Sequence, residues 1–437
     1  MENLHHAIED ARSRFVAANP MSESADKAAA RYLPGGNTRT VLHFDPFPLT
    51  LVGGDGAEVT DLDGHRYVDF VGEYSAALFG HSNAVIKAAI HEALEGGITM
   101  GAPTRYEREL AGLLCERFPS LDQVRFCNSG TEANLMALCT ARVVTGREKI
   151  LAFNDAYHGG VVKFLGGQSA LNVPFDFVLA DYNDIEGTSA VIDGVGKELA
   201  AVIIEPVLGA GGNIQGNRQF LNMLRQKTEE VGALLIFDEV KTARLGPAGI
   251  QGMLDFNPDL TTLGKFISGG MPTGAFGGSA EIMSHYDPRR KGALAHAGTF
   301  NNNVCSMAAG CAGMRDVYTA ARAAEFFDWS EAFRLSLNAM FSAKSVPLYA
   351  NGMGSMIALH FSREPTKRPS DITAGCRKLR PLLHIELLLD GVSICSRGDL
   401  FLSLPMTDEH LAKARQALEK FADRYKPLIE ETLAAHA

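Results

Sequence analysis

Five short apolar runs in the middle of the chain alternate with stretches long enough for helices, and no other feature constrains the fold as much. The runs are typical of strands that are buried on both faces, and they cover residues 124–128, 150–153, 201–206, 233–238 and 260–264. Between them, residues 132–145 and 220–231 have the spacing of helices. This order predicts an α/β fold on a mostly parallel sheet. Ligands bind such sheets beyond the carboxyl ends of the strands.

Composition and charge narrow the range of partners. The 437 residues carry 41 basic and 51 acidic side chains, a net charge of −10, which argues against binding to nucleic acid or to an anionic membrane. A small-molecule partner fits better. Residues 1–20 lack a signal-peptide core and no run reaches the roughly 18 apolar residues of a membrane span, so we expect a cytoplasmic protein. The seven cysteines form no CxxC pair, which predicts free thiols and no structural metal site.

The segment from Asn128 to Asn134 follows one predicted strand and opens a predicted helix. Its free backbone N–H groups and the hydroxyls of Ser129 and Thr131 would point at one spot, which suits a phosphate. The same residues would also make an ordinary helix cap. On this segment alone, both interpretations stay open.

Two carboxylates, Asp238 and Glu239, end another predicted strand. Such a pair also occurs on the metal-binding strand of a nucleotide hydrolase, but that enzyme needs a phosphate loop. The Gly-Lys pair at Lys265 is followed by Phe266, and position 259 is aspartate instead of glycine, so the phosphate-loop pattern fails.

Lys265 directly follows the predicted strand 260–264, so neighbouring strand ends would bring it close to Asp238. A pyridoxal-5′-phosphate (PLP) enzyme needs a lysine amine for the Schiff base and an acid that keeps the pyridine nitrogen protonated. It also needs a phosphate anchor, which Ser129–Thr131 would supply, and Tyr157 would offer an aromatic face to the ring. Together these residues predict a PLP site.

Several motifs in this order resemble the class III aminotransferases. They are Asn128–Ala133, Tyr157–Gly159, Ile204–Pro206, Phe237–Val240, Leu263–Lys265 and Ala297–Thr299. The resemblance implies PLP as cofactor, fold type I with a seven-stranded, mainly parallel large domain, and a homodimer with active sites at its interface. It also implies a smaller α+β domain from both chain ends. We therefore expect the large domain at residues 76–315, with 1–75 and 316–437 contributing to the small one.

The resemblance assigns roles to individual residues. Lys265 would be the Schiff-base lysine, Asp238 the partner of the pyridine nitrogen and Tyr157 the ring-stacking residue. The phosphate would be held by Ser129, Gly130 and Thr131, and by Thr299 of the partner subunit. Glu205 would lie near the ring.

Two subgroups of this family compete. Residues 101–104 and 269–272 are shared with glutamate-1-semialdehyde 2,1-aminomutases, which exchange amine positions within one substrate. The β-amino acid (β-phenylalanine) aminotransferases are similar in segments expected to touch the substrate: 35–39, 47–50, 73–74, 156–160, 299–303 and 396–398. The mutases carry tryptophan in place of Tyr74 and histidine in place of Gly160, and these departures favour the aminotransferase.

An enzyme that handles both β- and α-amino acids must bind carboxylates at two distances from the reacting amine. Guanidinium groups bind carboxylates bidentately. By the resemblance, Arg39 would bind the β-amino acid and Arg397 the α-carboxylate of 2-oxoglutarate, although either could be a surface ion-pair residue.

Four apolar or aromatic side chains are expected to form one wall of the substrate pocket, or else part of the core: Tyr74, Leu78, Phe79 and Met100. A racemase or decarboxylase on the same fold stays an alternative, because either would need the same lysine. A PLP-fold binding protein without activity would usually lack Lys265.

Overall fold

A seven-stranded sheet forms the centre of the described chain, which a computed structural model covers from residue 3 to residue 436. Its order is β4-β12-β11-β10-β7-β5-β6. The strands are β4 (Gln123–Cys127), β5 (Lys149–Phe153), β6 (Asp176–Ala180), β7 (Leu199–Ile204), β10 (Leu234–Asp238), β11 (Leu260–Gly264) and β12 (Gly274–Gly278). Only β12 runs antiparallel to its neighbours within this sheet. The predicted mainly parallel sheet of seven strands is therefore confirmed.

All five predicted strands are present, but the sequence did not reveal β6 or β12. Three of the five residues of β12 are glycine, a residue that is depleted in strands. The structure shows why glycine is needed at Gly274. A Cβ atom there would lie 2.1 Å from the carbonyl oxygen of Ser129, the residue that caps the helix after β4.

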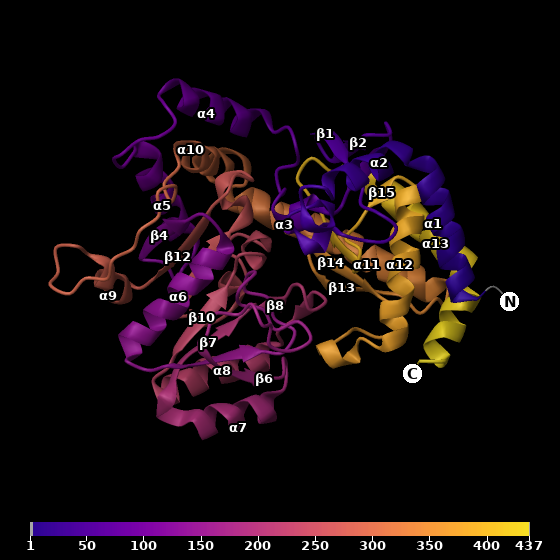
Figure 1. Cartoon of the computed structure of the whole chain (residues 1–437). Helices are drawn as coiled ribbons and strands as arrows, with labels where there is room; N and C mark the ends of the chain where they lie inside the picture. The colour runs from indigo at the N-terminus through magenta and orange to yellow at the C-terminus, as the bar shows by residue number, and fades with distance from the viewer. Residues whose placement is uncertain (1–2, 437) are drawn as a thin grey trace.

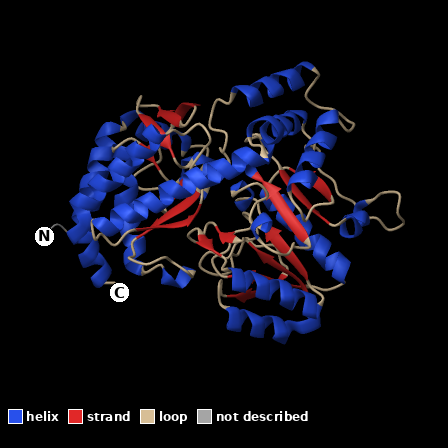
Figure 2. Cartoon of the chain, turned by 180° about the vertical axis from the view of Figure 1, so that it is seen from behind, coloured by secondary structure: helices blue, strands red, loops and turns tan. Residues whose placement is uncertain are grey.

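Helices cover both faces of this sheet (Figure 2). The chain crosses the sheet in one direction from β4 through α6 (Gly130–Thr145) to β5, and in the other from β7 through α8 (Arg218–Val231) to β10. Because such crossovers are right-handed, α6 and α8 lie on opposite faces. Both helices begin with a side-chain cap and end at a left-handed glycine. The two predicted helices are thus confirmed.

The two ends of the chain pack together beside the central sheet (Figure 1). Strands β1 (Leu51–Asp55), β2 (Glu58–Asp61) and β3 (Arg66–Asp69) are antiparallel, and β15 (Val392–Ser393) joins β3 from the other end of the chain. A further sheet contains β13 (Tyr349–Met353), β14 (Met356–His360) and β16 (Asp399–Phe401). The domain boundaries at 75/76 and 315/316 stay a prediction.

The remaining elements surround these sheets. They are α1 (Leu4–Ala18), α2 (Pro20–Ala29), α3 (Gly72–Ser75), α4 (Ala84–Glu95), α5 (Arg105–Arg117), α7 (Ile185–Val195), α9 (Ala280–Met283), α10 (Val304–Ala312), α11 (Ala320–Ala343), α12 (Ala374–Leu389), α13 (Asp408–Ala434) and the hairpin of β8 (Val207–Leu208) and β9 (Ile214–Gln215). Among residues 3–436, no helix has the length and apolar character needed to cross a membrane.

The contact at Gly274 generates the first prediction. We expect Gly274→Ala to lower the free energy of unfolding by about 1–3 kcal/mol, because its methyl group must displace the backbone at Ser129. Urea denaturation followed by circular dichroism would measure it. The matched control is Gly112→Ala in α5, where a Cβ meets no atom within 4 Å. The higher helix propensity of alanine should there raise the free energy of unfolding by about 0.5–1 kcal/mol. Equal effects of the two variants would contradict the argument.

Candidate active site

Asp238 and Lys265 lie at one edge of the central sheet, as the sequence predicts. Strands β10 and β11 are parallel neighbours, and Asp238, the last residue of β10, is paired with Thr262. Lys265 follows the end of β11 directly and has a φ of 57°. A lysine in the left-handed region is strained, and such strain is common at functional sites.

The carboxylate of Asp238 is buried and held from three sides. Its Oδ2 atom lies 2.8 Å from His158 Nδ1 and accepts a hydrogen bond of 2.8 Å from Asn134 Nδ2. Its Oδ1 atom accepts a hydrogen bond of 3.0 Å from the backbone N–H of Val240. Asn134 is itself fixed, since its Oδ1 accepts a hydrogen bond of 2.6 Å from the Thr262 hydroxyl. The position and orientation of Asp238 therefore depend on α6, on the loop after β5 and on β11.

Glu239, next in the chain, has a different environment. It is fully buried, and it accepts hydrogen bonds from the Thr242 hydroxyl at 2.5 Å and from the backbone N–H groups of Ile250 and Gln251 at 3.1 and 2.9 Å. These partners all follow it in the chain, so Glu239 closes the loop after β10. Of the two adjacent carboxylates, only Asp238 faces the edge of the central sheet that also carries Lys265; we call this edge the rim.

Burial and neighbouring charges tune the Lys265 amine. Burial lowers the pKa of Lys265, and the carboxylates of Asp238 and Glu205 oppose this shift. Glu205 is buried as well, and it accepts hydrogen bonds of 2.9 Å from the Tyr157 N–H and 3.1 Å from the Gly209 N–H. Burial raises the pKa of Glu205. A lowered lysine pKa makes the neutral, nucleophilic amine more available near neutral pH.

The start of α6 forms a tight backbone cradle at the same rim. Ser129 caps the helix by accepting a hydrogen bond of 3.2 Å from the Glu132 N–H. A Cβ on Gly130 would lie 2.7 Å from Val240, in the loop that follows Asp238. One on Gly159, in the Tyr157 loop, would lie 2.3 Å from the Thr131 hydroxyl. The first N–H groups of a helix have no partner within it, so this end suits an anion.

These groups together fit PLP. The amine of Lys265, the carboxylate of Asp238 and the helix start at Ser129–Thr131 match its aldehyde, its pyridine nitrogen and its phosphate. Tyr157, 41% exposed in the loop after β5, would offer a ring face. Thr299 lies on an exposed loop, and its predicted role from a partner subunit stays a prediction.

A left-handed turn carries Tyr74, an expected substrate-binding residue. Glu73, Tyr74 and Ser75 have φ angles of 47°, 53° and 80°. A left-handed backbone costs roughly 1–2 kcal/mol for each residue other than glycine. The turn is held at its end by Arg244, which is buried and donates hydrogen bonds to the carbonyl oxygens of Ser75, at 3.0 Å, and of Leu402. The hydroxyl of Tyr74 donates to the carbonyl oxygen of Val41 at 2.7 Å.

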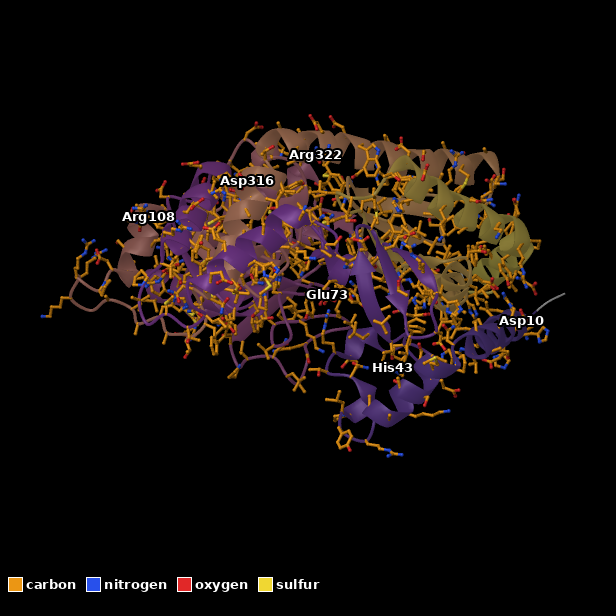
Figure 3. The ribbon with its side chains drawn as sticks, turned by 90° about the horizontal axis from the view of Figure 1, so that it is seen from above. Asp10, His43, Glu73, Arg108, Asp316 and Arg322 are labelled. Carbon is orange, nitrogen blue, oxygen red and sulfur yellow. The ribbon has the colours of Figure 1, made fainter. Side chains whose placement is uncertain are left out.

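Both arginines predicted to bind carboxylates face the ring of Tyr74. The central guanidinium carbons of Arg39 and Arg397 lie 5.4 and 5.6 Å from the ring centroid. Arg39 also pairs with Glu73, which lies between the two halves of the molecule in Figure 3. Arg397 donates from Nε to Asp399 at 2.5 Å, so its terminal nitrogens are available to a carboxylate. The structure therefore brings the two arginines and Tyr74 together.

The rest of the expected apolar wall is divided. Leu78 and Phe79 are buried in the main hydrophobic core, where Phe79 packs against Phe266 and Tyr318. Of the two interpretations that the sequence left open for Leu78 and Phe79, the core one therefore holds. Met100 is 46% exposed.

Sequence reasoning gave no role to several residues that shape the site. Asn134 and His158 hold Asp238, Asp399 holds Arg397, and Arg244 holds the turn of Tyr74. His158 and Asn134 do lie inside motifs that the sequence singled out. Arg244 and Asp399 lack such a signal. The contacts of Arg244 join segments more than 100 residues apart. Asp399 lies two residues from Arg397, and the sequence does not show which way that arginine points.

Comparison with known proteins gives a consistent picture. Residues 43–422 match the aminotransferase class-III family. The chain is 46% identical over 426 residues, 98% of both sequences, to a β-phenylalanine transaminase from Variovorax paradoxus. The crystal structure of a β-phenylalanine aminotransferase from that organism superposes with a TM-score of 0.96 over 97% of this chain and 99% of the other. A glutamate-1-semialdehyde 2,1-aminomutase from Shouchella clausii is 37% identical, over 91% of this chain and 97% of its own.

Mutation of the two adjacent carboxylates should affect turnover differently. Asp238→Asn should reduce the rate per folded molecule by at least about 100-fold, because a neutral amide cannot keep a pyridine nitrogen protonated. It should also cost about 1–3 kcal/mol of stability, because its amide nitrogen would face the donors that now bind the carboxylate. Glu239→Gln should cost about 1–3 kcal/mol of stability, because an amide nitrogen would face backbone donors, yet folded molecules should stay active. Turnover per folded molecule and thermal unfolding would separate the two. Loss of activity in Glu239→Gln at unchanged stability would contradict this division.

Proposed function

Because the chain belongs to the class III aminotransferase family, whose members are PLP-dependent, we propose that it moves the amino group of a β-amino acid to a 2-oxo acid. The observation that carries this proposal is the pair of arginines on the Tyr74 ring. Two separate guanidinium groups would let one site bind carboxylates at two distances from the reacting amine. An aryl β-substituent, as in β-phenylalanine, would suit the aromatic surroundings.

Each residue of the rim has a defined task in this reaction. PLP, when bound, withdraws electrons from the substrate carbon that carries the amine. Lys265 Nζ would hold the cofactor, and once displaced by the substrate amine it would take the proton from that carbon and return it to the cofactor. Asp238 would keep the pyridine nitrogen protonated, and its three hydrogen-bond donors would keep the carboxylate aligned.

The phosphate and ring contacts complete the proposal. Ser129, Gly130 and Thr131 would bind the phosphate at the start of α6, together with Thr299 of the partner subunit in a homodimer. Tyr157 would stack on the ring. Glu205, which fixes the Tyr157 backbone, would position that ring contact.

The competing function is an aminomutase, which needs no amino acceptor. The test is incubation of the yellow holoenzyme with β-phenylalanine, with and without 2-oxoglutarate, and quantification of glutamate. We expect glutamate only when both are present. Turnover of glutamate-1-semialdehyde alone, without glutamate from β-phenylalanine, would establish the mutase instead.

The arginines should separate donor from acceptor binding. We expect Arg397→Met to raise the KM for 2-oxoglutarate by about 10- to 100-fold, the loss expected for charge-assisted hydrogen bonds. The KM for β-phenylalanine should change much less in this variant. Arg39→Met should show the reverse, and steady-state kinetics with each substrate varied would measure both. If either variant raised both KM values equally, the division of roles between the two arginines would be wrong.

A further inference from the structure

Lys241 is a buried lysine near the site, and neither the cofactor nor the carboxylate-binding roles above use it. It lies in the loop after β10, three residues beyond Asp238, and is only 9% exposed. Its Nζ atom lies 4.5 Å from the ring centroid of Phe401 and 3.4 Å from Asn213 Oδ1. Within residues 3–436, no carboxylate forms an ion pair with it. Burial of an ammonium without a direct counter-ion is costly, so its retention calls for a reason.

A chain of polar contacts joins Lys241 to Arg397. Asn213, itself fully buried, accepts the long hydrogen bond from Lys241 on Oδ1 and donates another of 3.4 Å from Nδ2 to Asp399 Oδ1. The other oxygen of Asp399 accepts the 2.5 Å hydrogen bond from Arg397 Nε. Asn213 has a φ of 48° and also donates to the Ile357 carbonyl oxygen at 3.0 Å, so its amide is fixed. The order along the chain is cation, amide, carboxylate, cation.

The charges of Lys241, Asp399 and Arg397 affect the binding of the acceptor. Asp399 fixes Arg397 but also cancels its charge, so the pair alone would attract an incoming carboxylate weakly. Lys241 restores one positive charge behind Asp399 in a site of low dielectric, where such a charge acts over a longer distance than in water. The incoming carboxylate of a 2-oxo acid would then neutralise the group of three.

We propose that Lys241 is a specificity-determining positioning residue, which acts through Asn213 and Asp399 to keep Arg397 attractive to the carboxylate of the 2-oxo acid. The inference rests on the proposed function, because Arg397 is its proposed acceptor-binding group. Lys241 does not touch the reacting atoms, and its effect should be confined to the acceptor half of the reaction.

The surroundings of Lys241 make this effect depend on pH. Burial lowers the pKa of Lys241 to about 8; Asp399 and Glu205 oppose the shift, while Arg397 and Lys265 add to it. The thiol of Cys395 also faces this group, and burial raises its pKa. Lys241 is therefore charged below about pH 8 and neutral above it. Acceptor affinity should be highest below pH 8 and fall as the pH rises through that value.

The decisive variant is Lys241→Met, which keeps an unbranched apolar side chain one atom shorter and removes the charge. Loading the enzyme with pyridoxamine 5′-phosphate allows the acceptor half-reaction with 2-oxoglutarate to be followed alone, by single-turnover absorbance. We expect the apparent Kd for 2-oxoglutarate to rise about tenfold, as for the loss of one partly screened charge. Calorimetry with glutarate, an unreactive dicarboxylate, should show the same loss, and the fall in affinity between pH 7 and pH 9 should be smaller than in the natural protein.

Asn213→Gly provides a second variant. Glycine adopts the left-handed backbone of this position without strain, so the variant breaks the bridge and keeps the loop. Like Lys241→Met, it should weaken the binding of 2-oxoglutarate and of glutarate. If Lys241→Met does not fold, as judged by thermal unfolding, Asn213→Gly and the pH profile of the natural protein carry the test.

Two results would overturn the inference. The first is an unchanged Kd for 2-oxoglutarate in the variants. The second is an equal loss of affinity in both half-reactions, or a shift in the absorbance of the bound cofactor. Either form of the second result would mean that Lys241 acts through Glu205 or Lys265. If the natural protein failed to react with β-phenylalanine, the proposed donor would be wrong, but the acceptor half-reaction from pyridoxamine 5′-phosphate would still report on Lys241.

Discussion

The candidate site depends on the buried carboxylate of Asp238, which lies at the end of a buried strand. A buried carboxylate is stable only if hydrogen bonds replace the water it has lost. Asn134, His158 and the N–H of Val240 supply them, and they come from a helix, a loop and the strand end itself. Correct placement of these segments is therefore a condition for burying Asp238, so the fold and the geometry of the candidate site form together.

Much of this rim could be predicted from the sequence, because the relevant residues follow strands in the chain. A buried parallel strand has a strong apolar signal, and its carboxyl end faces the ligand whatever the details of packing. Asp238 and Lys265 follow from that rule alone, and Ser129–Thr131 from the helix start after β4. These positions needed no knowledge of distant contacts.

The missed features share a different physical origin. The glycines of β12 give no strand signal, and their need is visible only when the Ser129 backbone lies against them. Arg244 reads as an ordinary surface arginine until folding brings it to the carbonyl oxygens of Ser75 and Leu402. Burial lowers the pKa of Arg244 to about 10. No local sequence pattern predicts a buried cation that donates hydrogen bonds to backbone oxygens of distant segments. For Leu78 and Phe79 the sequence left pocket and core open, because an apolar residue beside a pocket and one in the core look alike in sequence.

The site also divides its chemistry between different parts of the chain. The residues proposed to act on the cofactor come from the ends of the central sheet, whereas Arg39, Tyr74, Arg397 and Asp399 come from the two chain ends. Changes in the chain-end segments can therefore alter which carboxylates are bound without disturbing the hydrogen bonds of Asp238. That separation accounts physically for a family in which transaminases and aminomutases share one fold and one cofactor. In this chain Lys241 joins the two parts, since it follows the strand of Asp238 and contacts the chain-end residue Phe401.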